Sequence, residues 1–286
     1  MKKEGKSTVL LMLGGIVFMI LMDAAGRYLV GNWYPYEFLL TVKNVLYVVE
    51  WTGIGFGLGL LAHGGRVKRI RISKAYLVGA LMVFLIGAFQ KRIYDIIPRS
   101  VMDWLYAQEI SIRIYENWFF AIAGLLLFLG VTSTPKTSGK SGRKLEWITC
   151  GVFLLLLFPL GQLGYKALQI PDEAGQQVYV ALYFVRFLLF GIVASLTAVP
   201  GAAEIPQKAD SLKSGTLCLA LSLGWFFLTK WSLVSDHPVI LWEGAYCSAL
   251  MLAAYGGLFL TKGALEARRG RDGEKVVEKA DHAVQR

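Results

Sequence analysis

The sequence has few charged residues for its length. Charged side chains make up 17% of the 286 residues, whereas soluble domains carry about 25%. Hydrophobic residues make up 55% and gather in long runs. A run of about 20 apolar residues is long enough to cross a bilayer as a helix. The low charge content therefore excludes an ordinary soluble domain and indicates an integral membrane protein.

Cysteine and histidine are also scarce, with three of each. Cys150, Cys218 and Cys247 lie in apolar segments without Cys-x-x-Cys spacing, where cysteine behaves as a small hydrophobic residue. We therefore expect neither a disulfide framework nor a metal site. His63 and His237 lie at opposite ends of apolar segments, so they do not provide a pair at one depth for haem. No cofactor motif is present, and no cofactor is expected.

Eight apolar segments follow one another along the chain. Each is expected to form a helix, because lipid cannot satisfy backbone hydrogen bonds and no period-2 alternation runs through these segments. They are residues 8–30, 38–62, 75–90, 117–133, 145–165, 178–200, 216–234 and 238–261. The sequence thus predicts an all-α, polytopic membrane bundle with about eight transmembrane helices. Residues 1–261 form the transmembrane domain, and residues 262–286 form a charged tail.

Basic residues are distributed unequally between the two sides of this bundle. One side carries 21 Lys and Arg residues and the other carries five. Because Lys and Arg are enriched in cytoplasmic loops, both termini are expected in the cytoplasm of a plasma-membrane protein. The net charge of +10 is then explained by topology, so membrane lipids are the expected partners and nucleic acid is not.

The glycines of GIGFGLG (53–59) lie inside a predicted span and lack the strand–turn–helix setting of a nucleotide site. The spacings Gly53/Gly57 and Gly55/Gly59 instead predict close helix packing. No repeat is inferred between the first and last four segments. EWTG (50–53) and LEWITCG (145–151) both place an acidic residue before Trp, but at different depths.

Seven ionisable residues remain inside the predicted spans. An unpaired charge at the bilayer centre costs at least about 2.5–3.5 kcal/mol, so such residues tend to face one another or a polar cavity. With a rise of about 1.5 Å per residue, none of them falls in the inner third of its span. We therefore expect a polar cluster in the outer half of the bundle. The seven residues are Asp23, Arg27, Lys43, Glu50, Arg186, Lys230 and Glu243.

Two interpretations of these charges stay open. In the first, they line an outward-facing polar basin that binds an anionic or lipid-linked ligand. In the second, they form interhelical ion pairs, with the longer side chains reaching toward the membrane surface. The ligand-binding residues under the first interpretation are Glu50, Arg186, Lys230, Glu243, Asp23 and Lys43.

Three classes of function fit this sequence. A transporter of a small or lipid-linked anion would use the charges of the outer half as its binding site. A membrane enzyme acting on lipid-linked substrates would use Glu50 or Glu243 as acid or base, and Arg186 and Lys230 to bind phosphate. A structural or assembly protein would use the charges for helix pairing alone. Of these three classes, transport is the preferred hypothesis.

Two short stretches resemble one enzyme family. HPVILWE (237–243) resembles the HPxxLYE stretch of prolipoprotein diacylglyceryl transferases, with Trp242 in place of Tyr, and AHGG (62–65) is similar to their HGG element. The resemblance implies transfer of a diacylglyceryl group from phosphatidylglycerol to a lipoprotein cysteine at the outer face of the membrane. It covers about eleven residues, and the predicted topology places His63 and His237 on opposite sides.

Overall fold

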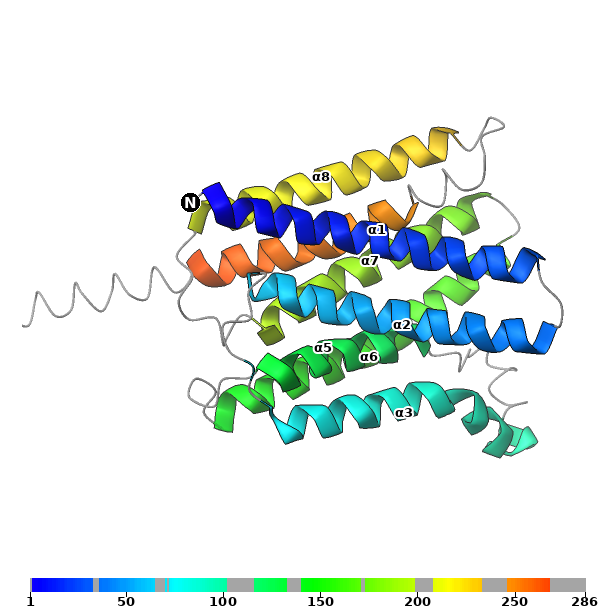
Figure 1. The fold of residues 1–286 in the computed structure, drawn as a ribbon. Helices are drawn as coiled ribbons and strands as arrows, with labels where there is room; N and C mark the ends of the chain where they lie inside the picture. The colour runs from blue at the N-terminus through cyan, green and yellow to red at the C-terminus, as the bar shows by residue number, and fades with distance from the viewer. Residues whose placement is uncertain are drawn as a thin grey trace, which may run out of the picture.

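The computed structural model describes residues 2–32, 36–64, 70, 72–101, 116–132, 140–170, 173–198, 208–232 and 246–267. All regular secondary structure in these residues is helical, and each apolar segment of the sequence contains a helix (Figure 1). The all-α class is therefore confirmed. The helices are α1 (Lys2–Asn32), α2 (Tyr36–Ala62), α3 (Lys74–Ile96), α5 (Glu116–Thr132), α6 (Lys140–Gln169), α7 (Glu173–Ala198), α8 (Lys208–Ser232) and Tyr246–Ala267, called here the 246–267 helix.

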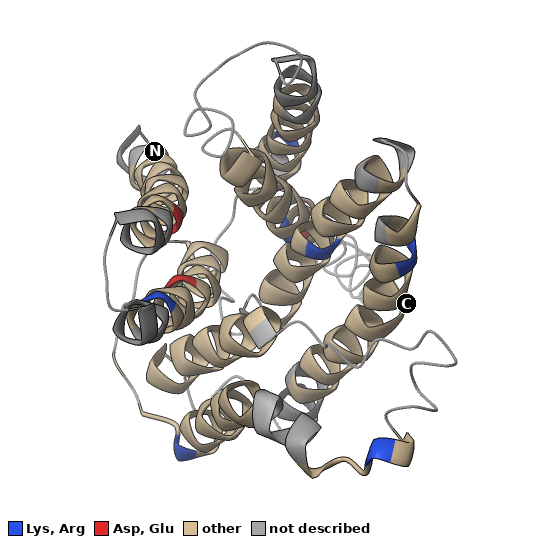
Figure 2. Cartoon of the chain, turned by 90° about the vertical axis from the view of Figure 1, so that its right-hand side faces the viewer, with Lys and Arg blue, Asp and Glu red and all other residues tan. Residues whose placement is uncertain are grey.

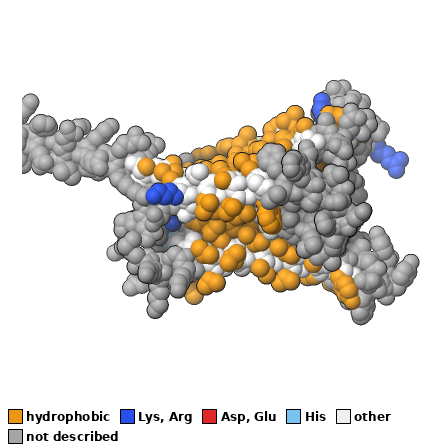
Figure 3. All heavy atoms as spheres, turned by 90° about the horizontal axis from the view of Figure 1, so that it is seen from above, with side chains coloured by type: hydrophobic (Ala, Val, Ile, Leu, Met, Phe, Trp, Pro, Cys, Tyr) orange, Lys and Arg blue, Asp and Glu red, His pale blue; other side chains and the backbone are white. Residues whose placement is uncertain are grey.

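Five of the described helices contain segments that are long and apolar enough to cross a membrane. They are Ser7–Gly26, Val42–Ala62, Trp147–Ala167, Gln177–Thr197 and Tyr246–Ala267. Two shorter apolar helical segments, Lys74–Phe89 and Asn117–Thr132, accompany them. Figure 3 shows hydrophobic side chains over the middle of the described surface, with Lys and Arg toward its ends. The chain therefore has the features of a helical membrane protein.

Helices α1, α2, α3 and α5 form one group, the N-terminal unit, in which α2 packs between α1 and α5, and α5 packs against α3. The closest approach is between α2 and α5. A methyl group added at Gly55 would collide with the carbonyl oxygen of Ala121, and one added at Gly124 would collide with that of Thr52. Only glycine allows these two backbones to approach so closely. The helix order across the group is thus α1–α2–α5–α3.

The later helices form a second group, the C-terminal unit. Helix α6 packs against α7, and α7 meets the 246–267 helix through glycine. Here a methyl group at Gly191 would collide with the carbonyl oxygen of Ala254, and one at Gly257 with that of Leu188. Helix α8 covers the other side of the 246–267 helix, where the Ser222 hydroxyl donates a hydrogen bond to the carbonyl oxygen of Ala249. The order is α6–α7–(246–267)–α8.

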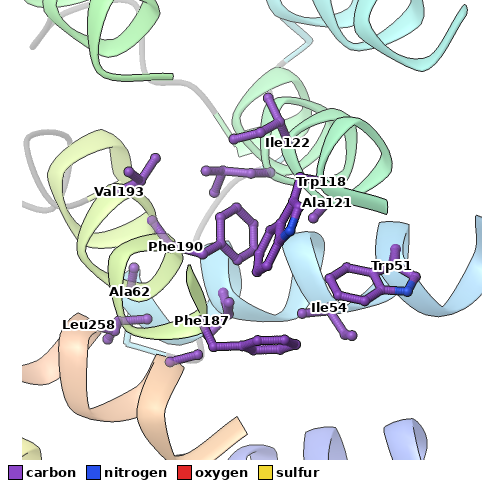
Figure 4. Close-up of a cluster of buried hydrophobic side chains, with 14 of the residues drawn as sticks. Trp51, Ile54, Ala62, Trp118, Ala121, Ile122, Phe187, Phe190, Val193 and Leu258 are labelled. Carbon is purple, nitrogen blue, oxygen red and sulfur yellow. The ribbon is translucent and has the colours of Figure 1, made fainter. Parts of the chain in front are cut away.

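Aromatic side chains fill the boundary between the two units (Figure 4). Trp51 of α2 lies 5.6 Å from Phe187 of α7, measured between ring centroids. The indole of Trp118 on α5 is fully buried and lies 5.1 Å from Trp51 and 5.2 Å from Phe187, edge-on to both rings. It also contacts Phe153 of α6 at 5.6 Å. Edge-on aromatic pairs contribute about 0.5–1.5 kcal/mol each beyond the area they bury.

The expected boundary at residue 261 falls inside a helix, since the 246–267 helix continues to Ala267. The side chain of Lys262 is buried in this last stretch. A methyl group at Gly263 would lie 2.9 Å from the backbone nitrogen of Leu212 on α8. The division of the chain into a transmembrane domain and a charged tail stays a prediction, because most of the tail lies outside the described residues.

Two glycines of the same α2 sequence provide a matched test of the close packing. The structure confirms close contact at Gly55 and Gly59, whereas nothing lies within 4 Å of a methyl group added at Gly57. Gly55→Ala should reduce the free energy of unfolding by about 1–3 kcal/mol, because the facing backbone must move. Gly57→Ala should leave it unchanged or raise it, since Ala favours helix by about 1 kcal/mol.

Thermal unfolding of the purified protein in detergent measures both variants. Equal melting temperatures for Gly55→Ala and Gly57→Ala would contradict the α2–α5 contact.

Candidate functional site

Arg186 is the charged residue held most deeply in the described structure. It lies 13 residues after the start of α7, about 20 Å along the helix axis at 1.5 Å per residue. Its side chain is 0% exposed. The Nη2 atom donates a hydrogen bond of 2.7 Å to the carbonyl oxygen of Leu160 on α6. Arg186 thus points into the contact between α6 and α7, away from lipid.

Three tyrosines lie near this guanidinium group. The Tyr183 ring lies one turn earlier on α7, with its centroid 5.1 Å from the Cζ atom of Arg186, a cation–π arrangement. Tyr179 lies a further turn away, its ring centroid 5.6 Å from that of Tyr183. Tyr246 of the 246–267 helix is close enough to interact electrostatically with all three residues. Guanidinium N–H groups and phenolic O–H groups therefore gather at one place between α6, α7 and the 246–267 helix.

An acidic pair lies on the other unit. Glu50 is 7% exposed and lies near the middle of α2, fourteen residues after Tyr36. Asp23 on the neighbouring helix α1 is close enough to interact electrostatically with it. Figure 2, which looks along the helices, shows acidic positions on α1 and α2 and Lys or Arg positions on several other parts of the described chain. The structure therefore brings together two carboxyl groups from different helices.

The acidic pair and the Arg186 group lie at the same level of the bundle. Glu50 directly precedes Trp51 and Arg186 directly precedes Phe187 in the sequence, and these two aromatic rings are in contact. Helices α2 and α7 also pack against each other. Three of the seven intramembrane charges predicted from the sequence thus lie in two groups, the acidic Asp23 and Glu50 on α1 and α2, and the basic Arg186 on α7.

The remaining predicted site residues do not join either group within the described part of the chain. Lys43 is exposed on α2. Lys230 lies on α8, but its side chain is outside the described residues, as is that of Arg27 on α1. Glu243 lies wholly outside the described residues. Whether these residues complete the polar cluster stays a prediction.

The three tyrosines around Arg186 were not among the residues singled out from the sequence. Their signal was present, because Tyr179, Tyr183 and Arg186 follow spacings of four and three residues and so share one face of a helix. Tyr246 carries no such signal, since only the folded structure brings the 246–267 helix beside α7.

The donor set around Arg186 suits an oxyanion and not a metal ion. Guanidinium has no acceptor and phenols are weak ligands when protonated. Within the described ranges, no three His, Cys, Asp or Glu side chains gather as a metal site. His63, at the end of α2, lies with its ring 5.9 Å from Phe128 of α5.

Comparison of the chain with known protein families, with curated proteins and with solved structures found no match.

Substituting Glu50 tests how the acidic pair affects stability. Glu50→Gln keeps the shape of the side chain but removes one of two neighbouring like charges, so the melting temperature should stay the same or rise. Lys43→Gln, on the same helix but exposed, should change it by no more than about 0.5 kcal/mol of unfolding free energy. A large loss of folded protein with Glu50→Gln alone would identify Glu50 as a member of a structural ion pair.

Proposed function

We propose that the protein is a plasma-membrane transporter with eight spans and cytoplasmic termini, and that it binds a small or lipid-linked anion at Arg186. The observation that carries this proposal is the complete burial of Arg186 at the middle of α7, among Tyr179, Tyr183 and Tyr246. The cytoplasmic placement of the termini is based on the excess of Lys and Arg in the loops on one side of the predicted bundle. In that orientation the site lies between the bilayer midplane and the outer surface.

The physical argument rests on the cost of a buried charge. A charged residue at the centre of a transmembrane helix costs at least about 2.5–3.5 kcal/mol, and such residues mark substrate or ion pathways in membrane proteins. A guanidinium group matches carboxylate and phosphate groups through two parallel hydrogen bonds. The phenols of Tyr179, Tyr183 and Tyr246 add O–H donors to the same place. The arrangement therefore favours an anion with two or more oxygens.

A membrane enzyme acting on lipid-linked substrates is the second candidate. The observation in its favour is Glu50, a buried carboxyl group at the level of Arg186 on α2, which packs against α7. A carboxyl group within reach of a bound phosphate ester acts as acid or base in hydrolysis or transfer. The two candidates differ in outcome, because a transporter releases its ligand unchanged and an enzyme alters it.

Thermal stabilisation by anions tests the binding site. Inorganic phosphate, sulfate, short dicarboxylates and short-chain phosphatidylglycerol are the probes. Since a ligand at 100 times its Kd stabilises by about 2.7 kcal/mol, at least one probe should raise the melting temperature of the wild-type protein. Arg186→Met should abolish the shift. Lys166→Met, which removes an exposed cation at the end of α6, is the matched control and should keep it.

Uptake of the stabilising anion into proteoliposomes then separates transport from catalysis. Transport is supported if the anion accumulates with its mass unchanged and if Arg186→Met abolishes this accumulation. A chemically altered product supports the enzyme. Stabilisation that persists in folded Arg186→Met protein would place the anion elsewhere and end the proposal.

A further inference from the structure

The two units have the same arrangement of helices. We number α1, α2, α3 and α5 as the first to fourth helices of the N-terminal unit, and α6, α7, α8 and the 246–267 helix as those of the C-terminal unit. In the N-terminal unit the first helix contacts the second, the second contacts the fourth, and the fourth contacts the third. In the C-terminal unit α6 contacts α7, α7 contacts the 246–267 helix, and that helix contacts α8. Within the described residues, these four helices of each unit therefore have the same order, first–second–fourth–third.

The glycine contacts occupy equivalent positions in both units. In each unit, a glycine of the second helix faces the carbonyl group of an alanine on the fourth helix. Three residues after that alanine, the fourth helix has a glycine of its own. This second glycine faces a carbonyl group on the second helix, three residues before the first glycine. The facing pairs are Gly55–Ala121 and Thr52–Gly124 in one unit, and Gly191–Ala254 and Leu188–Gly257 in the other. The second helices are related by 136 residues and the fourth helices by 133.

A third contact obeys the same relation. In the N-terminal unit, a methyl group at Gly130 of α5 would lie 2.8 Å from Cδ2 of Leu77 on α3. In the C-terminal unit, a methyl group at Gly263 of the 246–267 helix would lie 2.9 Å from Cδ2 of Leu212 on α8. Gly130 and Gly263 are again 133 residues apart. The same spacing thus relates two independent helix contacts in each unit.

The sequences at these positions are similar once they are aligned by contact. LYVVEW (46–51) corresponds to LYFVRF (182–187), and AIAGLLLFLG (121–130) corresponds to AYGGLFLTKG (254–263). The second alignment has five identical residues in ten, including both glycines that make the close contacts. The shared pattern A-x-x-G-L-x-L-x-x-G places small residues at the close helix contacts of both units.

The contacts between the units are also paired, as a two-fold interface requires. Trp51 of one unit contacts Phe187, the residue at the equivalent position of the other unit. On one side of this pair, Trp118 of the fourth helix contacts Phe153 of α6, a first helix. On the other side the 246–267 helix contacts α1, since the Tyr255 hydroxyl donates a hydrogen bond of 3.0 Å to the carbonyl oxygen of Met12. Each fourth helix thus touches the first helix of the other unit.

We infer that the chain is an internal duplication whose two units are related by a pseudo-two-fold axis between Trp51 and Phe187, and that the units rock about the seam between them when ligand binds at Arg186, next to that seam. The axis runs along the helices, so it is parallel to the membrane normal. Parallel repeats of this kind hold their ligands at the repeat interface and rock about it. The seam and its rocking rest on the proposed transport function; the duplication does not.

The duplication gives the charged groups a common position. Glu50 and Arg186 are equivalent residues, and each is preceded three residues earlier by a tyrosine, Tyr47 or Tyr183. Glu50 interacts with Asp23 of α1, while Arg186 binds the carbonyl oxygen of Leu160 on α6. Each charge therefore lies against the first helix of its own unit. Tyr47 lies 6.1 Å from Trp51, and Tyr183 lies 6.4 Å from Phe187, so the tyrosines flank the axis.

Matched glycine variants test the duplication. Gly124→Ala and Gly257→Ala should lower the melting temperature by a similar number of degrees, because both force the second and fourth helices apart. Gly14 of α1 and Gly151 of α6, one in the first helix of each unit, have nothing within 4 Å of an added methyl group. Their alanine variants should cause no loss. A large loss for one of Gly124→Ala and Gly257→Ala, with none for the other, overturns the equivalence.

Distances between spin labels test the rocking in the full chain, in nanodiscs, with and without the stabilising anion. Val45 and Lys74 are exposed in the N-terminal unit, and Lys166 and Lys213 in the C-terminal unit. The native cysteines are buried, so the unsubstituted protein measures background labelling. Distances across the seam, Val45→Cys with Lys166→Cys and Lys74→Cys with Lys213→Cys, should shift in opposite directions.

Distances within one unit, Val45→Cys with Lys74→Cys and Lys166→Cys with Lys213→Cys, should stay constant. One fixed distance for every pair, in both conditions, overturns the rocking, and so does a shift within a unit as large as that across the seam. Failure of every anion to stabilise the protein would instead refute the proposed ligand, while the glycine variants still decide the duplication.

Discussion

The close approach of two pairs of helices through glycine is the constraint on which this structure depends. Helices in lipid gain little from hydrophobic burial against one another, so their association relies on tight packing of small residues. Gly55 and Gly124 bring α2 against α5, and Gly191 and Gly257 bring α7 against the 246–267 helix. Each close pair leaves one face of its second helix available. These faces meet at Trp51 and Phe187, and this contact sets the level at which Glu50 and Arg186 lie.

The class of the fold could be predicted from the sequence because one physical property dominates it. Long apolar runs specify helices when lipid is the solvent, and the described helices follow those runs closely. The glycine spacing also predicted the contacts of Gly55 and Gly59, though Gly57 of the same pattern faces open space. Spacing identifies which residues share a helix face, but not which other helix packs against that face.

Prediction of the site was less complete for a related reason. The depth of Arg186 follows from counting residues, whereas its neighbours Tyr246 and Leu160 come from helices distant in the sequence. The sequence comparison did not indicate a repeat, because it paired EWTG (50–53) with LEWITCG (145–151), two stretches that share an acidic residue before Trp. Contacts align Glu50 with Arg186, a residue of opposite charge. A comparison based on residue type cannot find a position whose residue type has been reversed.

That reversal has a consequence for how such a protein arises. In a symmetric dimer of two identical chains, any substitution occurs twice, so both copies of a position carry the same charge. Joining the copies in one gene removes this restriction, and each half then changes alone. Glu50 and Arg186 record such divergence: a single polypeptide presents acid on one flank of its axis and base on the other. Fusion of the halves was thus the condition for a polarised interior.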